Sequence, residues 1–303
     1  MNIVIIGAGA MGSIYGGRLS QHNQVCLIDT NEAIVRQIRT HGLILQENGA
    51  EHTYYPDART SAAGMPPADL VILFVKALYS RQALTAAREL IGPRTYLMTL
   101  QNGAGHEDLL AEFAPRDHII IGTTEDNGAV LAPGHVRRGG TGKTNIGMLT
   151  EDASGFLRTL KDTLDACGFQ GCIHKNIRQL IWNKLFTNAS LSALTGVLQV
   201  PMGYIAGNPH AWTVARRLIR EAVEVAHALG LEADEEAVTE MVRQNSVNSP
   251  EGITSICADL RDGRRTEVGT ISGSVVRAAK ACGVPAPTHE LMVELIRALE
   301  ERP

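Results

Sequence analysis

A glycine-rich segment near the start of the chain constrains the fold more than any other feature. It has the form G-x-G-x-x-G and directly follows the apolar run Asn2–Ile6. A helical pattern over Ser13–Ser20 and a second apolar run, Val25–Ile28, come next. In this context the glycines allow a tight turn, a close approach of the backbone to a pyrophosphate and close packing of the helix on the sheet. Residues 1–29 therefore predict a dinucleotide-binding unit, whose cofactor-binding turn would be Gly7, Ala8, Gly9, Ala10, Met11 and Gly12.

Asp29 ends the second predicted strand, where a carboxylate can accept hydrogen bonds from the adenosine ribose and would repel a 2′-phosphate. The next two residues, Thr30 and Asn31, carry no positive charge, although Arg36 lies one or two helical turns further on. These residues favour NAD(H), with NADP(H) as the alternative. Asp29 is also placed to cap the following predicted helix, Glu32–Arg39, a role compatible with ribose binding.

Strand-like runs alternate with helical stretches through the first half of the chain. Besides the two above, the predicted strands are Leu70–Val75, Tyr96–Leu100, His118–Gly122 and Asn145–Gly147. Such alternation is typical of an α/β fold, here a Rossmann-type doubly wound parallel sheet. Strand patterns fade after about Phe169, and from Ile177 the pattern is almost wholly helical. We therefore expect a dinucleotide-binding domain over residues 1–170 and an all-helical C-terminal domain over residues 171–303.

Composition and charge narrow the class of protein. The chain has 303 residues, 44% hydrophobic and 20% charged, with a formal net charge of −4. An acidic balance argues against a nucleic-acid or anionic-membrane partner, and no apolar run reaches the length of a membrane span. The five cysteines form no C-x-x-C pair, and no signal peptide precedes the first strand. We expect a cytoplasmic protein with no metal site and no disulfide framework.

Two polar residues follow predicted parallel strands, at the edge where doubly wound sheets bind ligands. Lys76 follows Leu70–Val75 and could bind cofactor ribose or substrate, or be an ordinary exposed lysine. Asn102 follows Tyr96–Leu100 and, with Gly103, also fits a simple turn.

The segment Arg178–Thr195 is predicted to form one helix. Lys184, Asn188 and Ser192 recur every four residues along it, on a stripe that overlaps the apolar face. Partial burial there would lower the pKa of the lysine and make its ammonium a proton donor near neutral pH. The alternative is a lysine whose stem packs while its charge reaches water.

A second polar cluster lies near the C-terminus. Thr254, Ser255 and Asp259 are predicted on a short helical stretch. Thr266 would cap a further helix, with Glu267 in its first turn, where a carboxylate suits the helix dipole. That interpretation explains Glu267 without any catalytic role.

Taken together, the chain resembles the ketopantoate (2-dehydropantoate) reductase family over nearly its whole length. The segments that carry the resemblance are GAGAMG at Gly7–Gly12, VKA at Val75–Ala77, LQNGAGHEDLL at Leu100–Leu110, IGTT at Ile121–Thr124, PGHVRRGGTGKTNIG at Pro133–Gly147, NIRQLIWNKLFTNAS at Asn176–Ser190, DLRDGRRTEV at Asp259–Val268 and ISGSVVRAAKACGVPAPT at Ile271–Thr288. Their order and spacing are specific in combination.

The resemblance implies a Rossmann domain followed by a helical substrate-binding and dimerisation domain, often in a homodimer. Lys184 would be the general acid that protonates the substrate carbonyl oxygen. Glu267 would hold the hydroxyl side of the substrate and support the lysine. The substrate-binding residues would be Asn102, Asn188, Ser192 and Ser255; the cofactor-binding residues would be those of the glycine-rich turn, Asp29, Lys76 and Asn102.

Three departures from the family pattern bear on cofactor and substrate. Thr30 stands where the family often has arginine, which favours NAD(H). Ser192 and Gly252 each replace an asparagine common in the family. The loss of two polar partners weakens the case for a hydroxylated substrate.

The leading prediction is an enzyme that reduces the C2 ketone of a 2-oxo acid, most plausibly 2-dehydropantoate to (R)-pantoate in pantothenate biosynthesis. One alternative is an NAD-dependent D-2-hydroxy acid dehydrogenase of the same family acting on branched or aromatic 2-oxo acids. An alternative of another class is a cofactor-sensing regulator without catalysis, which would have no need of a proton donor such as Lys184.

Overall fold

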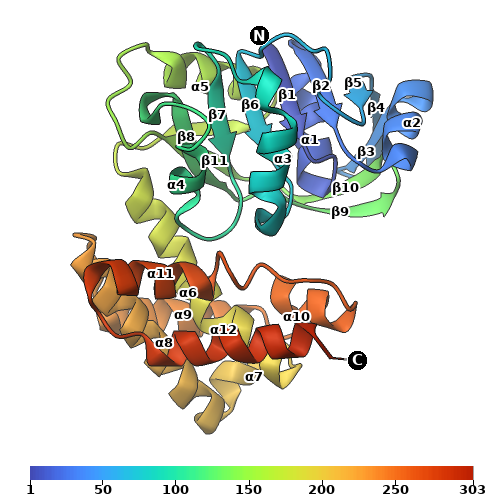
Figure 1. Ribbon diagram of the computed structural model, residues 1–303. Coiled ribbons are helices and arrows are strands. Elements are labelled where there is room, and N and C mark those ends of the chain that lie inside the picture. The colour runs from blue at the N-terminus through green and yellow to red at the C-terminus, as the bar shows by residue number, and fades with distance from the viewer. Residues whose placement is uncertain (303) are drawn as a thin grey trace. The chain divides into compact units, whose positions relative to one another are not determined.

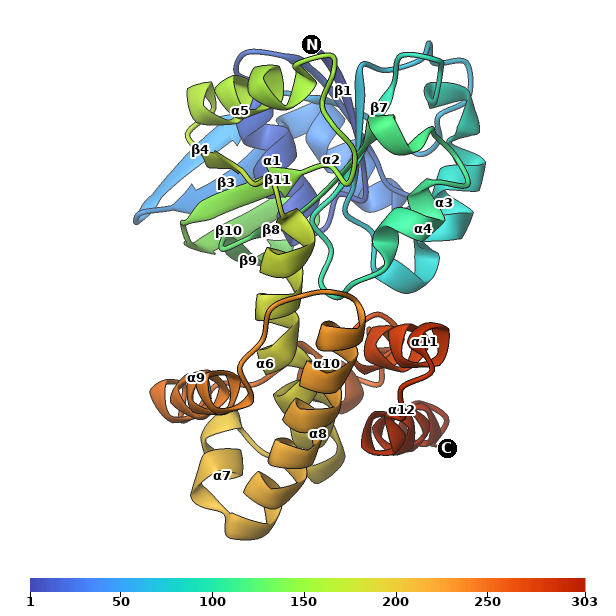
Figure 2. The same cartoon turned by 90° about the vertical axis from the view of Figure 1, so that its left-hand side faces the viewer.

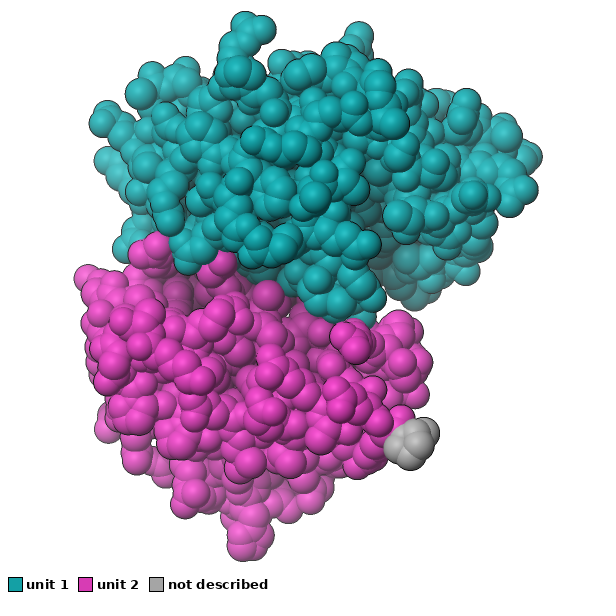
Figure 3. All heavy atoms as spheres, in the orientation of Figure 1, with its two compact units in different colours: residues 1–101, 106–177 teal, residues 102–105, 178–303 magenta. Residues whose placement is uncertain are grey.

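The computed structural model describes residues 1–302, which form two compact units (Figures 1 and 3). Unit 1 comprises Met1–Gln101 and His106–Ile177; unit 2 comprises Asn102–Gly105 and the chain from Arg178 onward. The domain boundary expected between residues 170 and 171 lies at the start of a strand, β12 (Gln170–Ile173), whose sheet belongs to unit 1. A short loop of the first half of the chain therefore belongs structurally to the second unit.

Unit 1 is built on an eight-stranded sheet in the order β12-β11-β8-β7-β6-β1-β2-β5. Neighbouring strands are parallel except β8 and β11, which are antiparallel. This confirms the predicted doubly wound α/β fold. The central strands are apolar throughout because both faces of the sheet are covered. The strands are β1 (Asn2–Ile6), β2 (Gln24–Ile28), β5 (Asp57–Arg59), β6 (Leu70–Leu73), β7 (Tyr96–Thr99), β8 (Ile119–Thr124) and β11 (Lys143–Gly147), with β12 at the edge.

Helices lie on both faces of this sheet. Figure 2 shows α3 and α4 on one face and α1 and α5 on the other. The helices of unit 1 are α1 (Ala10–Leu19), α2 (Glu32–His41), α3 (Ser80–Ala86), α4 (His106–Leu110) and α5 (Phe156–Ala166), with short 3₁₀ turns at Ala77–Tyr79, Arg88–Leu90 and Arg116–His118.

A second, four-stranded sheet was not predicted. Its order is β4-β3-β10-β9, and its strands are β3 (Leu43–Glu47), β4 (Ala50–Tyr54), β9 (Asn127–Ala132) and β10 (His135–Gly140). The β3–β4 hairpin turns through Asn48 and Gly49, both with positive φ, as a two-residue hairpin requires. The sheet depends on the parallel pairing of β3 with β10, which are far apart in sequence and leave no local pattern.

Unit 2 is helical, as predicted. The predicted helix Arg178–Thr195 forms the body of α6 (Ile177–Leu198). The expectation that a helix begins at Thr266 is wrong: Glu267 lies in a bend, residues 268–271 form a turn, and α11 begins at Ser272. The remaining helices are α7 (Met202–Gly207), α8 (Pro209–Ala228), α9 (Glu235–Asn248), α10 (Ser255–Arg261), α11 (Ser272–Cys282) and α12 (Pro287–Glu300). Among residues 1–302 no helix combines the length and apolarity needed to cross a bilayer.

Candidate active site

The glycine-rich turn joins β1 to α1 in a conformation that only glycine permits at two positions. Gly7 has φ +101°, and a Cβ there would lie 2.8 Å from the Val75 backbone nitrogen. A Cβ on Gly12 would lie 1.8 Å from the Gly7 carbonyl oxygen. At Gly9, by contrast, a Cβ would meet nothing within 4 Å, and no side chain caps α1 there. The positive end of the helix dipole therefore faces open space beside Gly9, where a pyrophosphate fits.

Asp29 fastens this turn to the end of β2. One carboxylate oxygen accepts the Ala8 N–H at 2.8 Å, and the other accepts the Asn31 N–H at 2.9 Å. The side chain of Asn31, not that of Asp29, caps α2 by accepting the Ala33 N–H at 3.0 Å. The interpretation that Asp29 caps this helix is therefore wrong, because Asn31 lies two residues closer and directly precedes the helix. Asp29 lines a cavity that adjoins the turn.

That cavity, of about 410 Å³, extends from Gly7 and Asp29 across the ends of β1, β2 and α3. Its polar lining includes the hydroxyls of Thr30, Thr60 and Ser61. None of its described lining residues is a lysine or arginine; the full set is Ile6, Gly7, Ile28, Asp29, Thr30, Thr60, Ser61, Ala62, Val75, Tyr79, Gln82, Ala83, Ala86 and Ala87. Its size lies within the range of small-molecule sites. Sequence reasoning missed its far wall, because Thr60 and Ser61 follow a three-residue strand that has no recognisable pattern.

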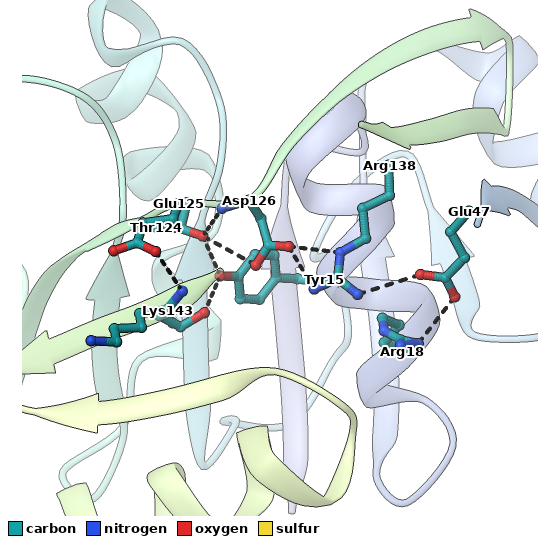
Figure 4. A network of polar contacts seen from close by, with 9 residues as sticks. Tyr15, Arg18, Glu47, Thr124, Glu125, Asp126, Arg138 and Lys143 are labelled. Carbon is teal, nitrogen blue, oxygen red and sulfur yellow. Dashed lines mark hydrogen bonds and ion pairs between the residues drawn. The ribbon is translucent and has the colours of Figure 1, made fainter. Parts of the chain in front are cut away.

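A buried polar network also contacts α1 and holds it in place (Figure 4). Tyr15 of α1 bonds Thr124 and Thr144 at 3.0 and 2.7 Å, and burial raises the pKa of its hydroxyl well above the usual value. Arg138 of β10 donates to Asp126 at 2.7 Å and to Glu47 at 3.3 Å.

Glu47 of β3 in turn accepts from Arg18 of α1 at 3.0 Å. The side chains of Arg138 and Asp126 are only 2% and 0% exposed. The network therefore joins α1 to both sheets of unit 1 and fixes the helix on which the glycine-rich turn depends.

The predicted substrate residues of α6 lie along one face of the helix. Lys184 is exposed, Asn188 half-buried and Ser192 buried. The expectation that Lys184 is partly buried is wrong: Lys184 and its neighbour Asn183 are exposed, while the stripe becomes buried toward Ser192.

The start of α10 packs against α6 beside Ser192. Thr254 caps α10 by accepting the Cys257 N–H at 3.3 Å, and its hydroxyl pairs with that of Thr195 at 2.8 Å. The predicted short helix after Thr254 is thereby confirmed. Ser255, the first residue of α10, is exposed and follows directly from this buried pair. The structure thus brings Ser192 and Ser255 into the same region of unit 2.

The segments that carry Asn102 and Glu267 contact each other, although they are far apart in sequence. Gly103 has φ +100°, and a Cβ there would lie 1.9 Å from the Thr270 carbonyl oxygen. That same oxygen accepts the Ala104 N–H at 3.2 Å. The segment Asn102–Gly105 is therefore held against the turn that carries Glu267, within unit 2.

Gly252, one of the departures from the family pattern, adjoins an apolar side chain. Its carbonyl oxygen accepts the Met202 N–H at 2.8 Å, and a Cβ on Gly252 would lie 3.4 Å from the Met202 sulfur. The Ser249 Cβ and carbonyl oxygen would lie nearer, at 3.0 and 3.1 Å, so the position where the family commonly carries an amide adjoins both polar and apolar atoms. Sequence reasoning missed Met202, because nothing local marks its contact with residue 252.

Within residues 1–302 no group of three or more histidine, cysteine, aspartate or glutamate side chains is placed to hold a metal ion. All five cysteines are free. Burial raises the pKa of the Cys26 thiol to about 12, so that it is a poor nucleophile.

Comparison with known proteins relates both parts of the chain to one family. Residues 3–151 match the family described as ketopantoate reductase PanE/ApbA, and residues 176–300 match its C-terminal family. A 2-dehydropantoate 2-reductase of Halobacterium salinarum is 30% identical over 98% of both chains.

Two solved structures resemble the whole chain. One is D-mandelate dehydrogenase in complex with NADH and anilino(oxo)acetate, at 31% identity and a TM-score of 0.90 over 99% of each chain. The other is a PanE/ApbA family ketopantoate reductase from Ralstonia eutropha, at 28% identity and a TM-score of 0.89 over 99% of each chain.

Proposed function

Because this chain belongs to the ketopantoate reductase family, it is an oxidoreductase, and we propose that it reduces the C2 ketone of a 2-oxo acid with a nicotinamide cofactor. The leading substrate is 2-dehydropantoate, which would give (R)-pantoate for pantothenate biosynthesis. The observation that carries the proposal is the combination of a dinucleotide turn open at Gly9 with a second unit in which the segment Asn102–Gly105 is held against the Glu267 turn.

The residues of unit 1 fit the cofactor. The N-terminus of α1 offers backbone N–H groups and partial positive charge to the pyrophosphate beside Gly9. Asp29 borders the adjoining cavity, where its carboxylate can accept from ribose hydroxyls, and Lys76 would add a contact at the end of β6.

Each substrate residue has a role that follows from its chemistry. When bound, the reduced nicotinamide supplies the hydride. The Lys184 ammonium neutralises the charge that develops on the carbonyl oxygen and donates a proton to it. Glu267 accepts a hydrogen bond from the hydroxyl side of the substrate. The amides and hydroxyls that donate to the substrate, including its carboxylate, are Asn102, Asn188, Ser192 and Ser255.

We propose NAD(H) as the preferred cofactor. Thr30 follows Asp29 at the cavity, and the described lining holds no cation to pair with a 2′-phosphate. Arg59, which ends β5, donates instead to Asp57 at 3.2 Å.

A second substrate class is supported by the departures from the family pattern at Ser192 and Gly252. Each replaces an amide side chain that could pair with a substrate hydroxyl, which favours a substrate with an apolar group instead. The alternative proposal is therefore a D-2-hydroxy acid dehydrogenase acting on branched or aromatic 2-oxo acids. The similar D-mandelate dehydrogenase was solved with NADH and anilino(oxo)acetate, an aromatic 2-oxo acid derivative.

The five free cysteines are typical of a reducing cytoplasm. The family resemblance also supports a homodimer. Light scattering on a sizing column measures the oligomeric state directly. A monomer at micromolar concentration would contradict this part of the proposal.

The experiment that tests the activity follows NADH and NADPH oxidation with 2-dehydropantoate, 2-oxoisovalerate, 2-oxoisocaproate and phenylglyoxylate. We expect turnover of at least one of them, and the ratio of kcat/KM values identifies the substrate class.

Lys184→Ala should lower kcat by about 10²–10⁴-fold, the usual contribution of a general acid. Lys175→Ala, which removes an exposed lysine just before α6, is the matched control. Inactivity with all four acids, or normal kcat in Lys184→Ala, would contradict the proposal.

A further inference from the structure

The turn that carries Glu267 is fixed by its own backbone. The Glu267 carbonyl oxygen accepts the N–H groups of Thr270 and Ile271 at 3.0 and 3.1 Å and the Thr270 hydroxyl at 3.2 Å. The Val268 carbonyl oxygen accepts the Gly273 N–H at 2.8 Å, which connects the turn to α11. These bonds determine the shape of the turn, but not where it lies in unit 2.

One carboxylate oxygen from the far end of the chain anchors the start of this turn. Oε1 of Glu300 accepts the Thr266 backbone N–H at 2.7 Å and the Thr266 hydroxyl at 2.6 Å. The same hydroxyl oxygen accepts the Val268 N–H at 3.1 Å. Thr266 is 5% exposed and Val268 is 3% exposed, so little water can replace these partners. The residues on both sides of Glu267 are therefore tied, directly or through Thr266, to Glu300.

Glu300 is itself held at a defined position, because it is the last residue of α12. The first turn of that helix is fixed to α8: both carboxylate oxygens of Glu221 accept the Thr288 N–H, and one also accepts the His289 N–H, at 2.9–3.0 Å. Met292, Val293 and Ile296 bury the intervening face of α12. The helix is about 21 Å long from its residue count. It therefore holds Glu300, which binds the Glu267 turn, at a fixed distance from α8.

We infer that Glu300 is a positioning residue: it places the Glu267 side chain for the substrate through Thr266, without touching the substrate itself. The inference rests on the proposed role of Glu267. Because among residues 1–302 only one oxygen of Glu300 is used, and only as an acceptor, the negative charge is dispensable. A glutamine, whose amide oxygen is also an acceptor, can make both bonds, whereas an alanine makes neither.

The test compares Glu300→Ala, Glu300→Gln and the neighbouring Glu301→Ala, which removes an exposed carboxylate one residue later. Glu300→Ala should lower kcat with the best 2-oxo acid by about 10–100-fold, since small misplacements of reacting groups have effects of this order. The dissociation constant for NADH should stay within twofold. Glu300→Gln and Glu301→Ala should keep kcat within about threefold of the unsubstituted protein, with an unchanged pH profile. A kcat of Glu300→Ala within twofold of normal, or a Glu300→Gln variant as impaired as Glu300→Ala, overturns the inference.

Hydrogen exchange separates this inference from the proposed reaction, because it needs no substrate. In Glu300→Ala the amides of Thr266 and Val268 should exchange at least tenfold faster, while those of α8 keep their protection. Glu300→Gln should match the unsubstituted protein. Unchanged exchange at Thr266 in Glu300→Ala refutes the anchoring even if the protein is active. Faster exchange in a protein that reduces none of the acids supports the anchoring and contradicts only the proposed reaction.

Discussion

Asp29 serves two roles with one side chain. Its two oxygens accept the Ala8 and Asn31 N–H groups, so the carboxylate shapes the turn while it borders the cavity. Each oxygen retains a further lone pair that can accept from a ribose hydroxyl. Replacing Asp29 would therefore disturb the turn as well as the proposed ribose contact, and Thr30 is the better position at which to test cofactor choice.

Thr30→Arg should move the cofactor preference toward NADPH. A guanidinium at the cavity can pair with a 2′-phosphate through charge-assisted bonds worth about 1.5–3 kcal/mol, or roughly 10–100-fold in the NADPH-to-NADH ratio of kcat/KM. Thr40→Arg, on the exposed end of α2, adds the same charge away from the cavity and should leave the ratio unchanged. An equal shift in both variants would show that overall charge, not position 30, sets the preference.

At this scale the sequence predicted single residues well where a backbone requirement identifies them. Gly7 and Gly12 were recognisable because no other side chain fits their positions. Thr266 was misinterpreted: a threonine followed by a glutamate is typical of a helix start, but its hydroxyl accepts the Val268 N–H within a turn. The partner that decides between the two, Glu300, is remote in sequence and leaves no local pattern.

Among the elements, the strands of the main sheet were predictable because they are apolar runs between turn residues. The four-stranded sheet was not, because β9 is exposed along its whole length and β4 nearly so. Their position depends on α1, since a Cβ on Gly128 of β9 would lie 2.5 Å from the Ile14 side chain. This close contact between a strand and a helix exists only in the folded unit, so no local sequence pattern predicts it.

Arg138→Met should lower the free energy of unfolding by about 3–5 kcal/mol, because it leaves Asp126 as an uncompensated buried charge, whereas Glu47 keeps its ion pair with Arg18. Arg137→Met, an exposed neighbour on the same strand, should change it by no more than about 0.5 kcal/mol. Urea unfolding monitored by circular dichroism measures both. Equal effects of the two substitutions would mean that the buried network of Figure 4 contributes little to stability.

In the whole molecule, resistance to acid should depend on His289, which is fully buried where α12 meets α8. Burial lowers its pKa below the ordinary 6.5, against the opposing effects of the Leu218 carbonyl and the Glu221 carboxylate. Below about pH 6.5 the unfolded chain therefore binds a proton that the folded chain excludes. The stabilisation is complete above that pH and is lost as the pH falls.

The Tm should consequently drop less between pH 7.5 and 5.5 in His289→Gln than in the unsubstituted protein, because a glutamine side chain binds no proton in this range. Its amide can still donate to the Leu218 carbonyl. His210→Gln, which replaces an exposed histidine of α8, should behave like the unsubstituted protein. Scanning calorimetry gives the Tm values. Parallel losses in all three proteins would assign the acid sensitivity to other groups.

The division of the chain into two units was the property that the sequence predicted least well. Composition and periodicity locate the change from strands to helices, but not the assignment of Asn102–Gly105 to unit 2, which depends on Gly103 and Ala104 meeting Thr270.

This contact also has a consequence during synthesis of the protein. At ordinary elongation rates the ribosome makes Thr270 on the order of 10–30 s after Ala104. The nascent chain must therefore keep the Gly103 backbone open and the Ala104 N–H hydrated until Thr270 has emerged. One of the loops proposed to bind substrate would be among the last parts of the protein to mature.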